Sequence, residues 1–200
     1  MLYASFNAPH APLQAPAEDI KRYAHIKDEK RRTYSAMVHR LDVNVGKIVD
    51  ELKAQNLFNN TVIVFLSDNG GPKAKKNPWT INAPFRGSKG NLLEGGVRVP
   101  FIMSWPNKIK AGTHYTHPIS VLDLAPTFVK AAGGNITKKD NFDGVNLLPF
   151  VKGNKLVTRD KEMMWRFTIS AGTLLSLKRN YMACLTIGKQ IVNNLLLILF

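Results

Sequence analysis

The chain has 200 residues, of which 44% are hydrophobic, so it can bury one sizeable core and is expected to form a globular unit. No repeat of about 20 residues and no low-complexity stretch is visible, which disfavours repeat architectures and disorder. A net charge of +14 favours anionic ligands, but the basic residues are dispersed and no aromatic-studded basic strand accompanies them, so we expect no nucleic-acid partner.

The amino end is predicted to be a β-strand at residues 2–6, followed by a loop at residues 7–12. Pro9 and Pro12 disfavour helix and remove backbone donors, so His10 is displayed at the end of a strand. A strand that begins at once, with no basic and apolar leader before it, predicts a fold truncated at its N-terminus and without a secretion signal.

A helix and a buried strand come next. The helix is predicted at residues 33–55, because apolar side chains recur there at steps of three and four residues. The strand at residues 61–66 is a near-continuous apolar and β-branched run, which is typical of a central strand buried on both faces. This succession predicts an α/β fold in which helices flank a layered sheet of parallel strands.

Polar residues and glycines follow the buried strand in the run Ser-Asp-Asn-Gly-Gly at residues 67–71. Ligands of open α/β sheets gather at the carboxyl ends of the strands, so chemistry is expected here. Residues 72–96 are predicted to form a long loop rich in Gly, Pro, Asn and Lys, and long loops in compact domains tend to be functional.

The remaining chain carries weaker signals. A strand is predicted at residues 99–105, and a helix at about residues 120–132 with Pro126 in its first turn, because a proline in a helix interior costs about 3 kcal/mol. No element is assigned past Phe167. The apolar tail at residues 195–200 is far shorter than the roughly 20 residues of a membrane helix, so no membrane association is expected.

Cys184 is the only cysteine of the chain. A single thiol excludes an intramolecular disulfide and a cysteine-based zinc site. Because its neighbours are mostly apolar, Cys184 is predicted to be an inert residue of the core.

Three groups of side chains could carry chemistry. Asp68 and Asn69 offer a carboxylate and an amide oxygen, which suit Ca²⁺ or Mg²⁺, although spacing alone favours a simple turn. Lys89, in a glycine-rich loop, could bind a tetrahedral oxyanion through its positive charge, although a solvated basic loop is the commoner explanation of this pattern. His10 could donate a proton or a hydrogen bond to a leaving oxygen, or could be an ordinary surface histidine.

Motifs of nucleotide and protease chemistry are missing. The sequence contains no Gly-x-Ser-x-Gly elbow, no Gly-x-x-x-x-Gly-Lys-Ser/Thr loop, no Gly-x-Gly-x-x-Gly after a strand and no His-Glu-x-x-His. The sequence therefore does not support a function as a nucleotide-binding protein or as a common type of protease.

The three groups lie in segments that share an order with a known family. The segments are Ser-Phe-Asn-Ala-Pro-His-Ala-Pro-Leu-Gln at 5–14, Phe-Leu-Ser-Asp-Asn-Gly-Gly at 65–71, Phe-Arg-Gly-Ser-Lys-Gly-Asn-Leu-Leu-Glu-Gly-Gly-Val-Arg-Val-Pro at 85–100, and two later segments at 120–127 and 143–149. Together they resemble the type I sulfatases of the alkaline phosphatase superfamily. More widely, the sequence resembles the arylsulfatase B-like branch of that family. The likeness covers about residues 2–153.

The resemblance implies a fold, a division of the chain and a set of roles. It implies an alkaline-phosphatase-like layered sheet, with the C-terminal part of a sulfatase catalytic domain at 1–153 and a C-terminal region, or part of a small subdomain, at 154–200. Asp68 and Asn69 would be ligands of a divalent cation, usually calcium. Lys89 would bind the sulfate group and His10 would contact the sulfate or the leaving-group oxygen. The partner would be a sulfated small molecule or glycan.

The family's nucleophile has no counterpart in this sequence. Family members carry, nearer their N-terminus, an aspartate pair for the cation and a Cys-x-Pro-x-Arg segment whose cysteine becomes formylglycine. Cys184 is followed by Leu-Thr-Ile and does not match that segment. We therefore expect this chain alone to be inactive. Two alternatives stay open: a phosphodiesterase or phosphonate hydrolase of the same superfamily, and a non-catalytic binder of sulfated polysaccharide.

Overall fold

The fold is taken from a computed structural model, which describes residues 1–73, 79–153, 155–157, 159, 163–168, 174–178, 185–186 and 196–199, with backbone alone for the four strands after residue 163. The helices are α1 (Ala17–Arg22), α2 (Glu29–Ala54), α3 (Glu94–Val97), α4 (Leu124–Ala131) and α5 (Leu148–Val151). The strands are β1 (Leu2–Ala4), β2 (Ile63–Leu66), β3 (Phe101–Ser104), β4 (His114–Tyr115), β5 (Met164–Thr168), β6 (Leu174–Lys178), β7 (Leu185–Thr186) and β8 (Leu196–Leu199).

Six strands form one mixed sheet in the order β1-β8-β2-β3-β7-β4, and β5 pairs with β6 in a separate two-stranded sheet. The α/β class is confirmed, but the prediction of a parallel sheet is wrong, since β3–β7 is the one parallel pair among the described strands. A continuous apolar run indicates that a strand is buried on both faces, but it does not indicate whether the neighbouring strands are parallel or antiparallel.

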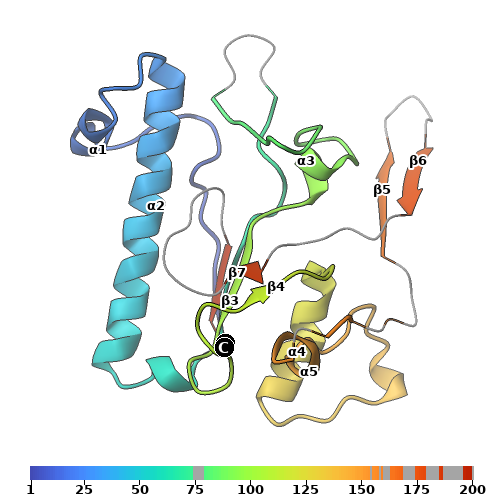
Figure 1. The fold of residues 1–200 in the computed structure, drawn as a ribbon. Coiled ribbons are helices and arrows are strands. Elements are labelled where there is room, and N and C mark those ends of the chain that lie inside the picture. Colours follow the sequence, from blue (N-terminus) through green and yellow to red (C-terminus); the bar gives the residue numbers. More distant parts are fainter. Residues whose placement is uncertain are drawn as a thin grey trace.

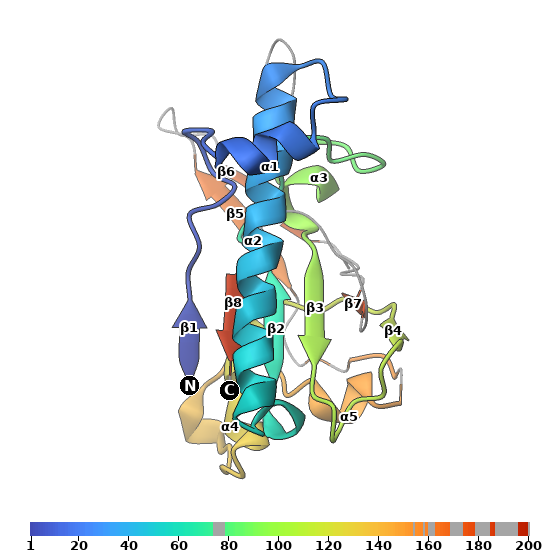
Figure 2. The same cartoon turned by 90° about the vertical axis from the view of Figure 1, so that its left-hand side faces the viewer.

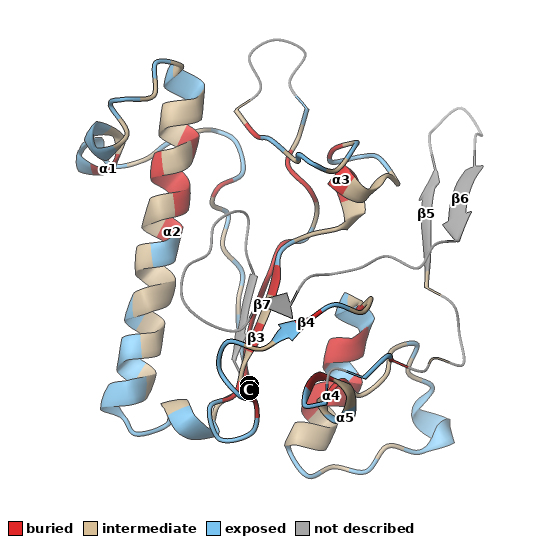
Figure 3. Cartoon of the chain, in the orientation of Figure 1, coloured by how far each residue is buried: buried red, intermediate tan, exposed pale blue. Residues whose placement is uncertain are grey.

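Helices cover both faces of the sheet, as expected (Figure 1). Along β2, Ile63 and Phe65 pack with Leu41 of α2. Val64 and Leu66 pack on the opposite side, in the cluster that includes Phe128 of α4. Side chains alternate between the two faces of a strand, so β2 supplies apolar groups to both layers. Figure 3 shows the buried residues where α2 and α4 lie, and the molecule is therefore built as helix, sheet and helix.

Several predicted elements are confirmed with shifted bounds. The predicted helix at 33–55 is α2, which starts earlier because the Oδ1 atom of Asp28 accepts a hydrogen bond of 2.7 Å from the backbone N–H of Arg31. The predicted strands at 61–66 and 99–105 are β2 and β3. Pro126 lies in the first turn of α4, as expected from its missing N–H.

The C-terminal residues contribute to the main sheet. The sequence pattern gave no element there, yet β8 lies between β1 and β2, and β7 lies between β3 and β4. The prediction for Cys184 lies outside the described residues. Of the helices that the structure describes, none has both the length and the apolar character needed to cross a bilayer.

The strand directions place the candidate residues at one edge of the sheet. Because β1 and β2 are both antiparallel to β8, they point the same way, and β3 runs back from the edge where β2 ends (Figure 2). Leu66 at the end of β2 pairs with Phe101 at the start of β3. The loop after β1, the start of the connection that leaves β2 and the end of the connection that enters β3 therefore meet at this edge.

Candidate functional site

His10 and Lys89 lie together although 79 positions separate them in the sequence. The Nζ atom of Lys89 is 3.2 Å from the Nε2 atom of His10. The Nδ1 atom of His10 is 2.8 Å from the carbonyl oxygen of Ala11, which can only accept, so we assign the ring proton to Nδ1. The Nε2 atom then carries the lone pair that accepts the hydrogen bond from the ammonium of Lys89.

Asp68 and Asn69 border the same space. They follow β2 directly, and the Nδ2 atom of Asn69 donates a hydrogen bond of 2.5 Å to the Oδ1 atom of Asp68. The hydroxyl of Ser67 donates to the carbonyl oxygen of Asn69 at 2.7 Å, which fixes the turn. A cavity of about 510 Å³ is lined by all four residues that the sequence singled out, His10, Asp68, Asn69 and Lys89.

The glycines of both segments allow the Lys89 loop to dock on the turn after β2. The backbone N–H of Lys89 donates to the carbonyl of Gly71 at 3.1 Å, and that of Gly70 donates to the carbonyl of Gly96 at 2.9 Å. A Cβ atom on Gly70 would lie 1.8 Å from the carbonyl oxygen of Gly95, so no side chain fits there. Close approach of two backbones thus explains the glycines and sets the position of Lys89.

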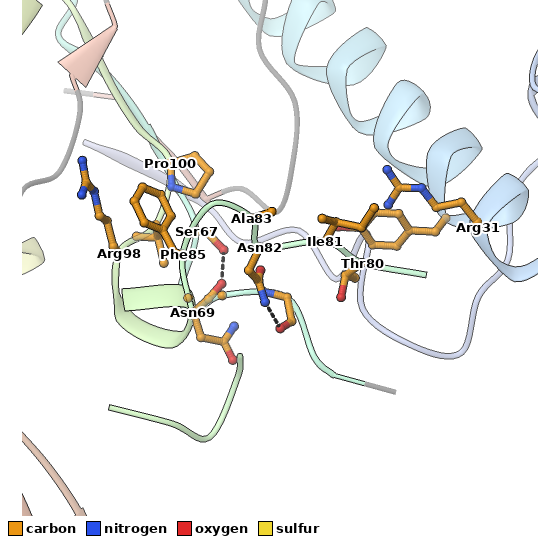
Figure 4. A pocket seen from close by; sticks show the side chains of 15 residues that line it. Arg31, Ser67, Asn69, Thr80, Ile81, Asn82, Ala83, Phe85, Arg98 and Pro100 are labelled. Carbon is orange, nitrogen blue, oxygen red and sulfur yellow. Dashed lines mark hydrogen bonds between the residues drawn. The ribbon is translucent and has the colours of Figure 1, made fainter. Parts of the chain in front are cut away.

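Asn82 is a further residue of the site that the sequence reasoning missed. Its Oδ1 atom accepts from the backbone N–H of Gly71 at 2.9 Å, and its Nδ2 atom donates to the carbonyl of Gly71 at 2.9 Å (Figure 4). The Nδ2 atom also donates to the carbonyl of Gly87 at 3.2 Å. One side chain therefore ties the turn after β2 to the Lys89 loop. Asparagine is common in loops, so only its position shortly before the 85–100 segment could have drawn attention to it.

A second, smaller cavity of about 250 Å³ adjoins the first and shares Tyr34, Asn69 and Gly70 with it (Figure 4). The guanidinium of Arg98 stacks over the ring of Phe85 at 4.3 Å and forms a 3.2 Å ion pair with Glu94. These contacts brace the wall of the smaller cavity rather than offer free charge.

The larger cavity has charged side chains that no ion pair between described residues neutralises. The ion pairs within the described ranges include neither Lys89 nor Asp68. Both side chains belong to exposed residues, so each is available to a ligand. The edge of the sheet therefore presents a cationic group and an anionic group in one open cavity.

Asp68 and Asn69 fit part of a calcium site. Carboxylate and amide oxygens are the ligands that Ca²⁺ and Mg²⁺ prefer, and Ca²⁺ takes six to eight of them. Among the described residues no group of three or more His, Cys, Asp or Glu side chains is close enough to hold a metal. Binding would also require the amide of Asn69 to turn its oxygen toward the ion, in place of the Nδ2 contact with Asp68.

Comparisons with known proteins show the family of the chain. The family model described as Sulfatase matches residues 1–134. The chain is 34% identical over 166 residues to the uncharacterized sulfatase YdeN of Escherichia coli, covering 82% of this chain and 29% of that protein. It is 35% identical over 147 residues to arylsulfatase J of Mus musculus, covering 73% and 24%. The chain thus spans 29% and 24% of the length of these two curated relatives, less than a third of either.

A solved structure supports the same assignment. The crystal structure of Ps i-CgsB in complex with k-i-k-neocarrahexaose matches with a TM-score of 0.78 and 36% identity, over 96% of this chain and 41% of that one. The family model covers well over half of the chain, and the mixed α/β fold agrees with this structure. The chain therefore belongs to the sulfatase family.

Proposed function

We propose that this chain supplies the sulfate-binding groups and part of the cation site of an enzyme that hydrolyses sulfate esters of aryl or sugar substrates. One observation carries the proposal. The ammonium of Lys89 and the imidazole of His10 are 3.2 Å apart in a cavity that Asp68 and Asn69 also line. A tetrahedral anion bound between the two nitrogens would accept hydrogen bonds from both once His10 presents a proton at Nε2.

Each side chain has a distinct part in this proposal. The ammonium of Lys89 would stabilise the charge that grows on the sulfate oxygens as the ester bond breaks. His10 would hold a hydrogen bond or a proton at the leaving-group oxygen. A cation held partly by Asp68 and Asn69, Ca²⁺ or alternatively Mg²⁺, would neutralise further charge on the sulfate. These roles require an ammonium, an imidazole and oxygen ligands for a cation, and Lys89, His10, Asp68 and Asn69 supply such groups at this edge of the sheet.

Sulfated sugars are the proposed substrate class. The solved relative Ps i-CgsB was crystallised with k-i-k-neocarrahexaose, and the sequence as a whole resembles the arylsulfatase B-like branch. The net charge of +14 would attract a polyanionic glycan. The same charge also supports a second candidate, a non-catalytic binder of sulfated polysaccharide, in which affinity comes from the surface as a whole.

Replacement of Lys89 by alanine separates the two candidates. We expect Lys89→Ala to weaken binding of inorganic sulfate by about 10-fold or more, because a charge-assisted hydrogen bond contributes about 1.5–3 kcal/mol. Sulfate titrations followed by NMR give the affinity. Lys108→Ala, at an exposed lysine in the turn after β3, is the matched control and should leave binding unchanged. Equal affinities of wild type and Lys89→Ala would support binding by surface charge and contradict the specific site.

The purified 200-residue chain is expected to show no turnover of a chromogenic aryl sulfate. The family's formylglycine derives from a Cys-x-Pro-x-Arg segment, and this sequence has none, so no covalent route is available to it. Release of the aryl alcohol can be followed by absorbance, with an active sulfatase as the positive control. Turnover that disappears in Lys89→Ala would show that this chain carries a nucleophile of its own.

A further inference from the structure

We propose that Trp79 and Lys30 form a sugar-binding subsite beside the sulfate position. In this subsite a pyranose ring stacks against the indole of Trp79, and the ammonium of Lys30 binds a second anionic group of the glycan. The inference rests on the proposed function, because it extends the same cavity. Trp79 lines the cavity together with His10 and Lys89, and it is half-buried, so one part of the residue is fixed while another stays accessible.

The backbone around Trp79 is anchored. The Nη1 atom of Arg31 donates a hydrogen bond of 2.6 Å to the carbonyl oxygen of Trp79, which ties this residue to α2. The next residue, Thr80, is buried and donates through its hydroxyl to the carbonyl of Pro72 at 2.5 Å. The backbone that bears the indole is thus anchored at Trp79 and at Thr80, which favours a defined position for the ring as a binding platform.

The chemistry at the indole suits a sulfated sugar. An aromatic face carries partial negative charge and attracts the C–H groups that line one face of a pyranose. Among the described residues the indole N–H of Trp79 has no hydrogen-bond acceptor, so it is available to a sugar hydroxyl. The Nζ atom of Lys30 lies 5.8 Å from the ring centroid, where it can meet a sulfate group next to the stacked sugar.

The volume of the cavity and the positive charge in and beside it are larger than a single sulfate group needs. A volume of about 510 Å³ falls within the range of pockets that bind small organic ligands. Lys30 is exposed and takes part in none of the ion pairs formed within the described ranges. Lys30 does not line the cavity but lies over the Trp79 ring, so a ligand with one ring and two anionic groups would place one group at Lys89 in the cavity and the other at Lys30 beside it.

The test compares two probes, k-i-k-neocarrahexaose and inorganic sulfate, on the full chain. Trp79→Ala should weaken binding of the hexasaccharide by about 10-fold, the value of one aromatic contact, and leave sulfate binding unchanged. Trp79→Phe keeps an aromatic face and should retain most of the affinity. Lys30→Gln should weaken the hexasaccharide alone. Leu57→Ala and Lys108→Gln, at exposed positions outside the cavity, are the matched controls.

The outcomes separate the subsite from the proposed function. If Lys89→Ala reduces binding of both probes while Trp79→Ala changes neither, the sulfate site stands and the subsite is overturned. If Trp79→Ala weakens only the hexasaccharide while Lys89→Ala changes neither probe, the subsite stands and the sulfate site is overturned. Equal weakening of both probes by Trp79→Ala and Trp79→Phe would mean a general disturbance and would also overturn the subsite.

Discussion

Asp123→Ala is expected to lower the free energy of unfolding by about 3–5 kcal/mol, the largest effect of a single substitution outside the site. Asp123 is fully buried at the start of α4. Its Oδ1 atom accepts from Nη1 of Arg159 at 2.6 Å and from the N–H of Val145 at 2.9 Å. Its Oδ2 atom accepts from Nη2 of Arg159 at 2.6 Å and from the N–H of Ser120 at 2.7 Å.

The cost arises from the groups left behind. Removing the carboxylate leaves the guanidinium of Arg159, whose side chain is only 13% exposed, and two backbone N–H groups without their acceptors. Urea unfolding followed by circular dichroism measures the change. Asp42→Ala is the control, since Asp42 is exposed and lies in α2, and it should change the free energy by no more than about 0.5 kcal/mol. A loss below about 1 kcal/mol in Asp123→Ala would contradict the account of this network.

Gly70→Ala is expected to destabilise the chain by about 1–3 kcal/mol or more and to abolish sulfate binding. The added Cβ atom would lie 1.8 Å from the carbonyl oxygen of Gly95 and 3.1 Å from the Cα atom of Gly96. The turn after β2 and α3 would have to separate. Lys89 is placed by the same pair of segments, so its ammonium would move away from His10.

The control for this substitution is Gly46→Ala. Gly46 lies within α2 and a Cβ atom there meets nothing within 4 Å, so alanine should stabilise the helix by roughly 0.5–1 kcal/mol. Thermal unfolding and the sulfate titration should be run on both variants. If Gly70→Ala binds sulfate as tightly as the wild type, close docking of the two backbones does not determine the position of Lys89.

Local pattern was enough to predict the elements that carry strong periodicity. The apolar face of α2 and the buried run of β2 are properties of consecutive residues, and both are found in the structure. The direction of the strands depends on partners far along the chain. β8 enters the sheet between β1 and β2, and neither its own residues nor theirs indicate that pairing. The prediction of a parallel sheet failed for this reason.

The site was predictable in its principal residues and not in its supports. His10, Asp68, Asn69 and Lys89 stand in segments that resemble a family, and the structure brings all four to one cavity. Their roles in binding and catalysis stay predictions. Asn82 and Trp79 were missed because neither residue type indicates a functional site by itself. Only their contacts in the structure show that they belong to the site.

A crystal structure of this chain grown or soaked with sulfate and calcium tests the central claim most directly. We predict a sulfate ion within hydrogen-bonding distance of both the Nζ atom of Lys89 and the Nε2 atom of His10, with any bound cation on the oxygens of Asp68 and Asn69. Sulfate ions found only at other basic residues, such as Lys108, with Lys89 and His10 left bare, would contradict it.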